Sequence, residues 1–446
     1  MTKIKNVIKR SGAIVPFTQN RVMNAIYRAA ISVGGRDKER AEFLSEKVVE
    51  ILEQKFDETN HPNIEEIQDV VEKVLVEHGH TQVAKEYIIY RDERNKKRKE
   101  DAAIASKPDE NIPWSKIWHV LDWAADKELN TVEKYNWRVN KGEFAQIVHE
   151  SEAAYEEDID TAARLIFERS ESVRMVFVSG PSSSGKTTST IKIEERLKKK
   201  GYKFATINVD HYFFDLEDHP KDEFGDYDFE TPQALDLALI NEHLLKLSQG
   251  EEIKIPHYDF KEGKRYLNRT PMKLENNEII LIDSLHGLYP DFSKDIPNEV
   301  KFKLFLEPLL QMKGDDGKYF QWTDVRLMRR MLRDSVQRAY DPLQTLEHWH
   351  YVRASELRNI IPYANSADFI INSGMPYELS LYKPKLFQLF EEWEKKFKDD
   401  PLKVDAYERA SRVKKMLSPI VSIEDDSPVP KDSVLREFIG GSIHKY

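Results

Sequence analysis

Apolar residues recur every three or four positions through much of the first 98 residues, which is the spacing of an amphipathic helix. Two such faces lie on residues 22–30 and 67–75, after a short strand-like start. A charged run over residues 91–101, followed by Ala-Ser-Lys-Pro, marks a boundary. We therefore expect a small, mostly helical domain over residues 1–98.

Residues 99–170 carry four tryptophans at helical spacing: Trp114, Trp118, Trp123 and Trp137. Aromatic residues spaced in this way usually belong to a core. A base-stacking surface is the alternative, and it is disfavoured because the segment is not basic. We expect a helical connector that packs against the rest of the chain.

The pattern changes at residue 171, after which short apolar runs alternate with helical segments. The runs occupy residues 176–178, 204–209, 278–282, 302–306 and 369–371. This alternation predicts an α/β fold, a parallel sheet flanked by helices, over residues 171–380. Ligands of such sheets bind at the carboxyl ends of the strands. Residues 381–446 predict two amphipathic helices and a tail.

Composition and charge exclude several classes of site. The 446-residue chain contains no cysteine, which excludes disulfides, a thiolate nucleophile and cysteine-ligated zinc or iron–sulfur sites. The net charge of −10 argues against a surface for bulk nucleic acid or an anionic membrane. No apolar segment lies near the start, and no run of about eighteen apolar residues occurs. We expect a cytoplasmic protein with no membrane partner.

The most specific chemical motif spans residues 180–187, Gly-Pro-Ser-Ser-Ser-Gly-Lys-Thr, between an apolar run and a helical segment. This is a Walker A phosphate loop, whose backbone N–H groups point at the phosphates of a nucleotide. Lys186 would reach the terminal phosphates, and the Thr187 hydroxyl would hold Mg²⁺. The expected nucleotide contacts are Gly180, Ser182, Ser183, Ser184, Gly185, Lys186, Thr187 and Thr188.

Two aspartates follow apolar runs of the same region. Asp283 comes directly after residues 278–282, which is how a Walker B carboxylate is presented to Mg²⁺. Asp210 follows residues 204–209, where a carboxylate can accept a hydroxyl proton during phosphoryl transfer. An ordinary turn or cap residue is the alternative for both. Beside a phosphate loop, we favour a metal ligand for Asp283 and a general base for Asp210.

Residues 324–340 predict a helix with Arg326, Arg330 and Arg333 on one face. Like charges at this spacing repel by about 0.2–0.5 kcal/mol per pair, so an anion or acidic side chains should lie opposite them. Pairing with surface glutamates is one interpretation. We favour a mobile lid that clamps ATP and neutralises charge in the transition state.

Several histidines raise the question of a metal site: His211, His219, His286, His348 and His350. The last two are separated by one residue and would diverge on a helix. No third ligand is evident near them. We therefore disfavour a histidine metal site.

Residues 171–380 resemble the uridine kinase and phosphoribulokinase family of P-loop kinases. Five ordered blocks carry the resemblance: the phosphate loop, Val-Asp-His-Tyr-Phe around Asp210, residues 228–236, residues 255–260 and the arginine helix. The resemblance implies a P-loop kinase fold and phosphorylation of a sugar hydroxyl that depends on ATP and Mg²⁺.

The same resemblance implies roles for particular residues. Asp210 would be the base, and Lys186, Arg330 and Arg333 would be the other catalytic groups. Thr187 and Asp283 would hold the metal ion. Arg338 matches a further lid arginine that contacts the nucleotide.

The acceptor side departs from the pyrimidine-nucleoside members of that family. Glu230 stands where they carry an aspartate for the ribose hydroxyls, and Gly263 where they carry a base-reading histidine. Tyr340 replaces another lid arginine. In three blocks, Asp-His-Tyr-Phe from Asp210, Pro-Lys-Asp-Glu-Phe-Gly from Pro220 and the terminal Leu-Arg-Glu-Phe-Ile-Gly-Gly, the chain resembles a bacterial uridine kinase-like subgroup with an extra N-terminal domain. The implied acceptor residues are Glu230, Tyr258, Arg330 and Tyr340, and specificity for uridine or cytidine is left open.

Residues 1–98 resemble an ATP-cone, the nucleotide-sensing domain found at the front of ribonucleotide reductases. Matching motifs lie at residues 7–12 and 66–72. The residues implied to line a regulatory site for ATP or dATP are Val7, Lys9, Arg10 and Arg21. Taken without the whole pattern, Lys9 and Arg10 would be a solvated basic turn, although such residues also suit polyphosphate.

These patterns favour an ATP-dependent nucleoside kinase that acts on a ribose-type 5′-hydroxyl and is regulated through the ATP-cone. By analogy, we expect a homo-oligomer whose rearrangement carries the regulation. One alternative is a kinase of another sugar or polyol, which the lost histidine favours. The other is a nucleotide-dependent regulatory switch without small-molecule kinase activity, which the presence of both Asp210 and Asp283 disfavours. Binding of RNA is disfavoured by the acidic chain.

Overall fold

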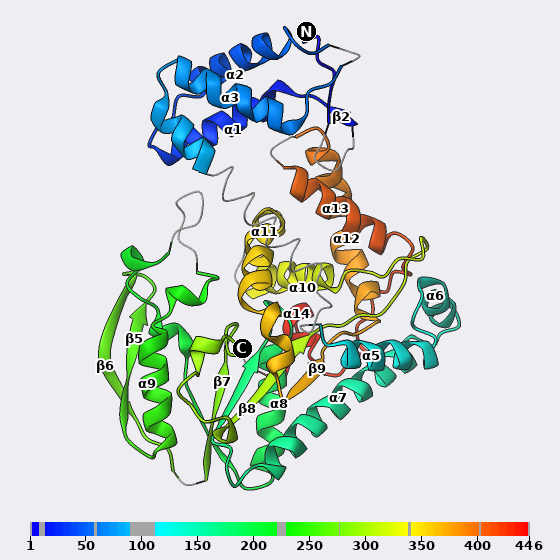
Figure 1. Ribbon diagram of the computed structural model, residues 1–446. Coiled ribbons are helices and arrows are strands. Elements are labelled where there is room, and N and C mark those ends of the chain that lie inside the picture. The colour runs from blue at the N-terminus through cyan, green and yellow to red at the C-terminus, as the bar shows by residue number, and fades with distance from the viewer. Residues whose placement is uncertain are drawn as a thin grey trace. The chain divides into compact units, whose positions relative to one another are not determined.

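The computed structural model describes most of the chain in two compact units. The described residues are 2–8, 14–57, 60–89, 112–220, 229–275, 277–337, 340–400 and 403–444. The smaller unit contains those up to position 89, and the larger unit contains nearly all of those from 112 onward. Figure 1 colours both units along the chain.

The smaller unit is a helical domain with one short hairpin. Strand β1 (Asn6–Ile8) pairs antiparallel with β2 (Ile14–Pro16). The helices that follow are α1 (Gln19–Ser32), α2 (Lys38–Leu52) and α3 (Ile64–Glu77). Residues 81–89 are also helical.

Local capping and one shared core hold these helices. Helix α3 begins with a reciprocal capping box between Asn63 and Glu66, which satisfies two backbone N–H groups at the helix start. The apolar faces expected on residues 22–30 and 67–75 meet α2 in a single core. Val71, Val74 and Leu75 are fully buried there. The expected helical N-terminal domain is confirmed.

The larger unit is built on a parallel sheet of five strands in the order β4-β7-β3-β8-β9. The strands are β3 (Met175–Ser179), β4 (Lys203–Thr206), β7 (Glu278–Asp283), β8 (Lys301–Glu307) and β9 (Phe369–Asn372). Each of them falls on one of the apolar runs named above. The expected α/β fold is confirmed.

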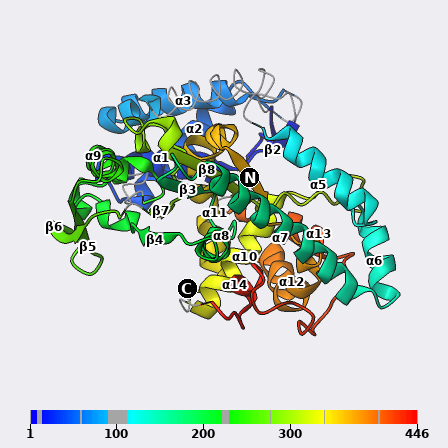
Figure 2. The ribbon, with the colours of Figure 1, turned by 90° about the horizontal axis from the view of Figure 1, so that it is seen from below.

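Helices cover both faces of this sheet. Val176 and Val178 of β3 belong to a core shared with α7 (Phe144–Glu168) and α8 (Lys186–Lys198). Phe177 belongs to a second core shared with α9 (Leu237–Ser248). Because successive strand residues point to opposite faces, a strand buried on both sides must be apolar throughout. Figures 1 and 2 show α7 and α8 side by side.

Two features of this region differ from the sequence-based expectation. Strand β4 ends at Thr206 rather than continuing to residue 209, and Asp210 lies in a 3₁₀ turn, Val209–Tyr212. The Asn208 side chain accepts a hydrogen bond from the Asp210 N–H at 3.0 Å, which starts the turn and ends the extended conformation. An antiparallel hairpin of β5 (Ile253–Asp259) and β6 (Lys264–Met272) was not expected as strands.

The connector folds as α5 (Trp114–Asp126), α6 (Val132–Asn140) and the long helix α7. Residues of α6 and α7 enter the main core, so the expectation of a packed connector is met there. The expectation that the tryptophans are core residues is wrong for three of them. Trp114, Trp118 and Trp137 are 61%, 65% and 50% exposed, and only Trp123 packs against the core. Val120 and Ala124 are the buried residues of α5, and Trp114 and Trp118 lie on its exposed side.

The remaining helices of the larger unit follow the sheet. They are α10 (Trp322–Gln337), α11 (Pro342–Asn359), α12 (Glu378–Phe397), α13 (Val404–Leu417) and the short α14 (Arg436–Ile439). In the part of the chain that the structure describes, no helix is long and apolar enough to span a membrane.

Candidate active site

The phosphate loop joins the end of β3 to the start of α8, at the carboxyl edge of the sheet. Its two glycines are required by close contacts. A Cβ on Gly180 would lie 2.3 Å from the Leu306 carbonyl oxygen. A Cβ on Gly185, whose φ is +86°, would lie 2.5 Å from a Val434 methyl group. No larger residue fits at either position without moving the chain.

Side chains from other elements hold the loop in place. Arg326 of α10 donates a hydrogen bond to the Ser182 carbonyl oxygen at 3.1 Å. Ser373, directly after β9, donates to the Ser184 carbonyl oxygen at 2.6 Å. The Arg330 guanidinium lies 3.3 Å from the Ser182 hydroxyl. The loop is therefore held by segments that lie far from it in the sequence.

The loop itself has unused hydrogen-bonding groups that suit phosphate. The Ser183 and Ser184 hydroxyls are buried and have no partner among the described residues. Ser183 has a positive φ of 61°, and Gly185 is also left-handed, a backbone pattern that forms anion-binding concavities. These groups fit the phosphates of a nucleotide.

Lys186 and Asp283 carry opposite charges beside this loop. Burial lowers the pKa of Lys186, while Asp283 and Glu437 act against that shift. Burial raises the pKa of Asp283, and Lys186 and a hydrogen bond from Thr187 oppose it. The Lys186 ammonium donates to the Pro181 carbonyl oxygen at 3.3 Å. Each charge thus helps to keep the other ionised.

Thr187 and Asp283 are the pair that fits a magnesium ion. The Thr187 hydroxyl lies 3.3 Å from Asp283 Oδ2, because β3 and β7 are neighbours and Val178 is in register with Asp283. A hydroxyl and a carboxylate at the end of a buried strand are oxygen ligands of the kind that Mg²⁺ prefers.

Asp210 lies at the same edge of the sheet. Partial shielding from water raises the pKa of its carboxylate, His211 lowers it, and the Asp283 carboxylate raises it further. Burial lowers the pKa of the adjacent His211, and His257 adds to that effect. The turn directly follows β4, which pairs in parallel with β7, so Asp210 lies at the same edge of the sheet as Asp283 although β4 ends earlier than expected.

The arginine helix α10 is a core element, which corrects the expectation of a mobile lid over its described length. Arg326 is fully buried between Glu307, at 2.9 Å, and Glu356, at 2.6 Å. Val325, Leu327, Met328 and Met331 of the same helix are also fully buried. The acidic side chains expected opposite the arginines are therefore inside the protein. They fix α10 against α11 and the sheet.

Arg330 and Arg333 differ from Arg326 because both reach the surface. Arg330 lies 3.5 Å from Glu230 and 3.4 Å from Asp334. Arg333 pairs with Asp334 at 3.1 Å, and it is close enough to Lys186 and Glu437 to affect their pKa values. Arg338 lies outside the described residues.

The residues expected at the acceptor are only partly brought together. The Glu230–Arg330 pair joins two of them. Tyr258 is 3% exposed and packs edge-on against Phe213 and Phe260. Tyr340 is 40% exposed, and its backbone N–H donates to the Asp334 carbonyl oxygen at 3.1 Å.

Gly263 has a physical reason to be glycine. It lies in the turn of the β5–β6 hairpin with φ of +65°, and a Cβ there would lie 2.9 Å from Leu216 Cβ. The Leu216 N–H donates to its carbonyl oxygen at 2.8 Å. A histidine at this position would be strained, so base recognition from this residue is incompatible with the local fold.

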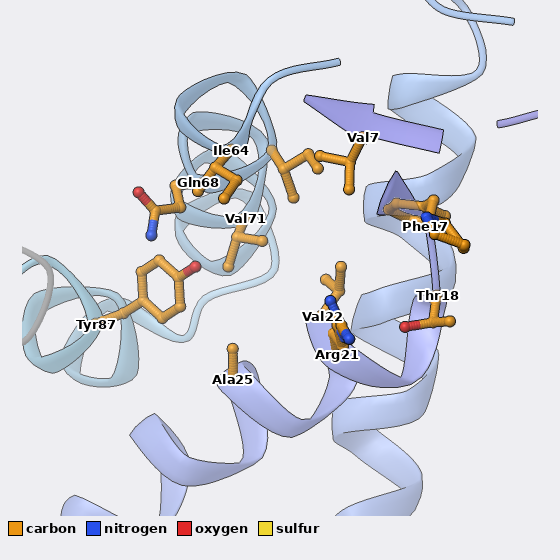
Figure 3. Close-up of a pocket in the computed structure, with 12 residues that line it drawn as sticks. Val7, Phe17, Thr18, Arg21, Val22, Ala25, Ile64, Gln68, Val71 and Tyr87 are labelled. Atoms are coloured by element: carbon orange, nitrogen blue, oxygen red, sulfur yellow. The ribbon is translucent and has the colours of Figure 1, made fainter. Parts of the chain in front are cut away.

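The smaller unit contains a pocket of about 160 Å³, which Figure 3 shows between α1, α3 and the hairpin. Its lining is mainly apolar, with Thr18, Arg21, Gln68 and Tyr87 as the polar members. Val7 and Arg21, two of the residues expected at a regulatory nucleotide, both line it. The other two, Lys9 and Arg10, lie outside the described residues.

Comparison with known proteins matches each unit to a family. Residues 175–380 match the phosphoribulokinase / uridine kinase family, and residues 5–96 match the ATP cone domain. The match to the kinase family is confined to residues 175–380. Both resemblances drawn from the motifs are confirmed.

Curated relatives agree with the two matches. The uridine kinases of Deinococcus deserti and Borrelia duttonii are 28% and 29% identical to this chain, over 45% and 47% of it and over 87% and 91% of their own lengths. The vitamin B12-dependent ribonucleoside-diphosphate reductase of Thermoplasma acidophilum is 43% identical over 24% of this chain and 14% of its own length.

The kinase-family match and the uridine kinase relatives indicate the type of reaction. The larger unit is an ATP-dependent kinase that phosphorylates a hydroxyl group, as expected from the phosphate loop and the two aspartates. The ATP cone domain in front of it is a nucleotide-sensing domain.

Several residues of the kinase site were missed by sequence reasoning. Glu307 ends β8 and Ser373 follows β9. Nothing in the local sequence distinguishes them from other residues at strand ends. His286 was considered only as a metal ligand. It is buried beside the site, and burial lowers its pKa to about 4 while a backbone hydrogen bond at Glu230 opposes that shift. Glu437 lies in the terminal Leu-Arg-Glu-Phe-Ile-Gly-Gly block, to which sequence reasoning gave no role in the site, yet its carboxylate accepts a hydrogen bond from Thr188 of α8.

Proposed function

We propose that the protein is a nucleoside kinase that transfers the γ-phosphoryl group of ATP to a ribose-type 5′-hydroxyl in the presence of Mg²⁺. The observation that carries this proposal is that Asp210, Lys186 and the Thr187–Asp283 pair all follow or end neighbouring parallel strands at the carboxyl edge of the sheet. The names of the uridine kinase relatives support a nucleoside acceptor.

The residues divide the transfer between them. The carboxylate of Asp210 accepts the proton of the attacking hydroxyl, whose oxygen forms a bond to the γ-phosphorus. The bond between that phosphorus and the β–γ bridging oxygen breaks, and ADP leaves. Lys186, Arg330 and Arg333 offset negative charge on the transferring group. When bound at Thr187 and Asp283, Mg²⁺ supplies further positive charge to the phosphate oxygens.

The acceptor side supports a sugar with adjacent hydroxyls. Glu230 can accept hydrogen bonds from two hydroxyls while its ion pair with Arg330 orients it. Phe260, which is 62% exposed and packs edge-on against the buried Tyr258, offers aromatic surface. Aromatic rings of this kind suit the flat face of a base.

A second candidate is a kinase of another sugar or polyol. It is favoured by the turn at Gly263, which excludes a base-reading side chain from that position. Under this proposal the Glu230–Arg330 pair would still hold the hydroxyls, and no base would be required.

The test is transfer of labelled phosphate from ATP, with Mg²⁺, to a panel of nucleosides, deoxynucleosides and sugars. We expect a labelled nucleoside, and we expect Asp210→Asn to lower kcat by about 10²–10⁴ while ATP still binds, because only the proton acceptor is lost. The matched control is Asp218→Asn, an exposed acid in the same region. Labelling of a non-nucleoside sugar would instead support the second candidate, and labelling of nothing on the panel would contradict both.

We also propose that residues 1–98 regulate the kinase, with residues 99–170 as connector, 171–380 as catalytic domain and 381–446 as extension. The proposed ligand of the cone is ATP or dATP, held in the pocket beside Arg21. Regulation requires that this ligand bind two states of the protein with different affinities. Rearrangement of a homo-oligomer is the proposed means.

A further inference from the structure

The C-terminal segment, residues 424–444, lies outside both family matches and packs into the kinase unit. Ser433, Val434, Leu435 and Phe438 are fully buried. The short helix α14 in this segment contacts α10. A segment with this much buried surface is an integral part of the unit.

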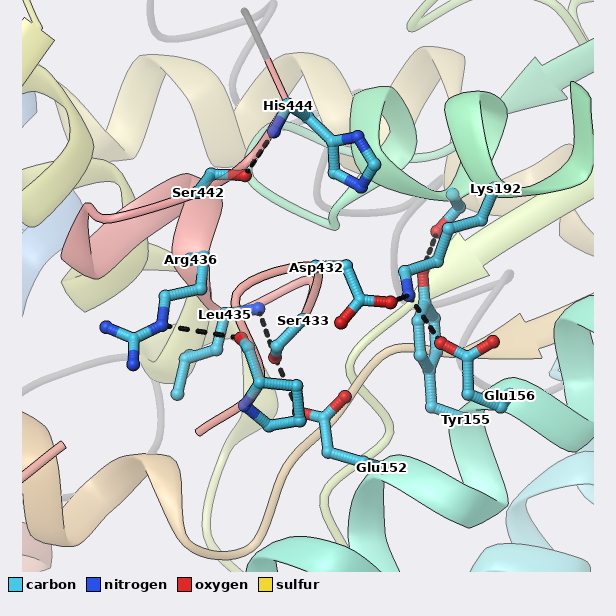
Figure 4. Close-up of polar contacts among 12 residues, drawn as sticks. Glu152, Tyr155, Glu156, Lys192, Asp432, Ser433, Leu435, Arg436, Ser442 and His444 are labelled. Carbon is cyan, nitrogen blue, oxygen red and sulfur yellow. Dashed lines mark hydrogen bonds and ion pairs between the residues drawn. The ribbon is translucent and has the colours of Figure 1, made fainter. Parts of the chain in front are cut away.

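Several polar contacts anchor the segment, and Figure 4 shows those of Lys192 and Ser433. Lys192 of α8 is 1% exposed and pairs with Asp432 at 2.8 Å and with Glu156 of α7. The Ser433 hydroxyl donates to the Glu152 carboxylate. The Arg436 guanidinium donates to the carbonyl oxygens of Asp426 and Val429, both at 2.8 Å, which closes the segment on itself.

Beyond these anchors the segment reaches the phosphate loop. A Val434 methyl group occupies the space in which Gly185 would carry a Cβ. The buried Glu437 carboxylate accepts a hydrogen bond from the Thr188 hydroxyl at 2.8 Å, in the first turn of α8. Burial raises the pKa of Glu437, while Thr188 and Arg333 lower it. Asp283 raises the pKa of Glu437 further, and Lys186 lowers it.

A buried carboxylate is a costly means of docking a segment. Burying an acid loses hydration that only specific partners restore, and an apolar residue of similar size would pack without that loss. The anchors at Lys192 and Glu152 already hold the segment. Glu437 faces the helix of the phosphate loop rather than these anchors. This position indicates a role other than docking the segment.

We propose that Glu437 is a positioning residue of the nucleotide site, which fixes Thr188 and the first turn of α8 so that the loop's N–H groups face the phosphates. The proposal rests on nucleotide binding by the loop and does not depend on which acceptor is phosphorylated.

Three substitutions at Glu437 separate the effect of side-chain length from the effect of charge. Glu437→Gln keeps an oxygen at the same distance from Thr188 and removes the charge. Glu437→Asp keeps the charge and withdraws the carboxylate by one methylene. Glu437→Ala removes both. Glu424→Gln and Glu424→Ala, at an exposed acid of the same segment, are the matched controls.

The measurement is ATP binding to the full chain without acceptor, followed by KM and kcat for ATP. Because the cone is also proposed to bind ATP, both are measured with Arg21→Ala as the common background. We expect the Kd for ATP of Glu437→Gln to stay within about threefold of the parent value. We expect Glu437→Asp and Glu437→Ala to raise that Kd about tenfold or more, as expected for loss of a hydrogen bond to a charged group. The acceptor KM should not change, and thermal unfolding shows whether each variant folds.

Other outcomes would overturn the proposal. Unchanged ATP affinity in both Asp and Ala would show that the contact does not position the loop. Weak binding by Gln with normal binding by Asp would assign the effect to charge. Equal losses in Gln and Asp that follow their losses of thermal stability would show a purely structural role. If Glu437→Ala does not fold, the comparison of Glu437→Gln with Glu437→Asp shows whether the contact positions the loop. Failure of the acceptor panel would leave the ATP-binding result intact, so the two proposals can fail separately.

Discussion

At the scale of single residues, the kinase site depends on charges that are partly or wholly removed from water. Lys186 and Asp283 each favour the charged form of the other, and Glu437 lies close to both. Asp210 differs from them because it is nearer to solvent and has only a histidine to offset its neighbouring carboxylate. It is therefore the group of this site whose protonation should limit activity under mildly acidic conditions.

The pH dependence of the reaction should reveal the raised pKa of Asp210. Asp210 must be ionised to accept a proton, and its pKa is raised, so kcat/KM for the acceptor should fall as the pH drops through that raised pKa. The fall should begin at a higher pH than for an ordinary aspartate, near 3.9. The check is a pH–rate profile of the folded enzyme. A rate that stays constant until the protein itself unfolds would contradict the proposed role of Asp210.

At the scale of elements, α10 links the phosphate loop to the core. Its Arg326 donates to the loop at Ser182 while pairing with Glu307 and Glu356. Its Arg329 is fully buried against Glu378, and the Arg329 guanidinium lies 5.0 Å from the centre of the Phe438 ring. A helix fixed in this way can hold Arg330 and Arg333 at defined positions, which suits preorganised charge better than a moving lid.

Removing the buried charge of α10 should therefore be costly. We expect Arg326→Ala to lower the free energy of unfolding by about 3–5 kcal/mol, because two buried carboxylates would lose their shared partner. Arg358→Ala, at an exposed position of α11, is the matched control and should change stability by less than about 0.5 kcal/mol. Urea unfolding of both variants makes the comparison. Similar stabilities for the two would show that the buried cluster is not a stabilising element.

At the scale of the whole molecule, the chain joins a nucleotide-sensing domain to a kinase. Arg21 is the only arginine or lysine lining the described pocket of the cone, and the other lining side chains are mainly apolar. An adenine ring suits the apolar part, and a guanidinium suits its phosphates. Such a ligand can change kinase activity only through its differential affinity for two states.

We expect Arg21→Ala to abolish the response of the kinase rate to added dATP, because the phosphate contact in the cone is lost. The kinase's own kcat at saturating ATP should remain, since Arg21 belongs to the smaller unit. The measurements are initial rates against dATP concentration, with the mass of the particle in solution followed alongside. Arg28→Ala, in the same helix and not among the pocket's lining residues, is the control. An unchanged dATP response in Arg21→Ala would place the sensing site elsewhere.

The sequence by itself determined the elements that depend on local pattern. Continuous apolar runs located the strands of the parallel sheet, helical periodicity located the helices of the cone, and the Walker A spacing located the phosphate loop. The partial errors, at β4, α10 and three tryptophans, arose where a local pattern is compatible with more than one environment. An arginine-rich helix has the same sequence pattern whether its partners are phosphates or internal glutamates.

Only the tertiary structure decided which distant residues meet. The Thr187–Asp283 pair follows from the parallel register of β3 and β7, and the holding of the loop by Arg326 and Ser373 follows from the packing of α10 and β9. The contact between Thr188 and Glu437 joins positions 249 residues apart. No local spacing encodes such a contact, because it exists only once burial of the surrounding apolar surface has brought the two segments together.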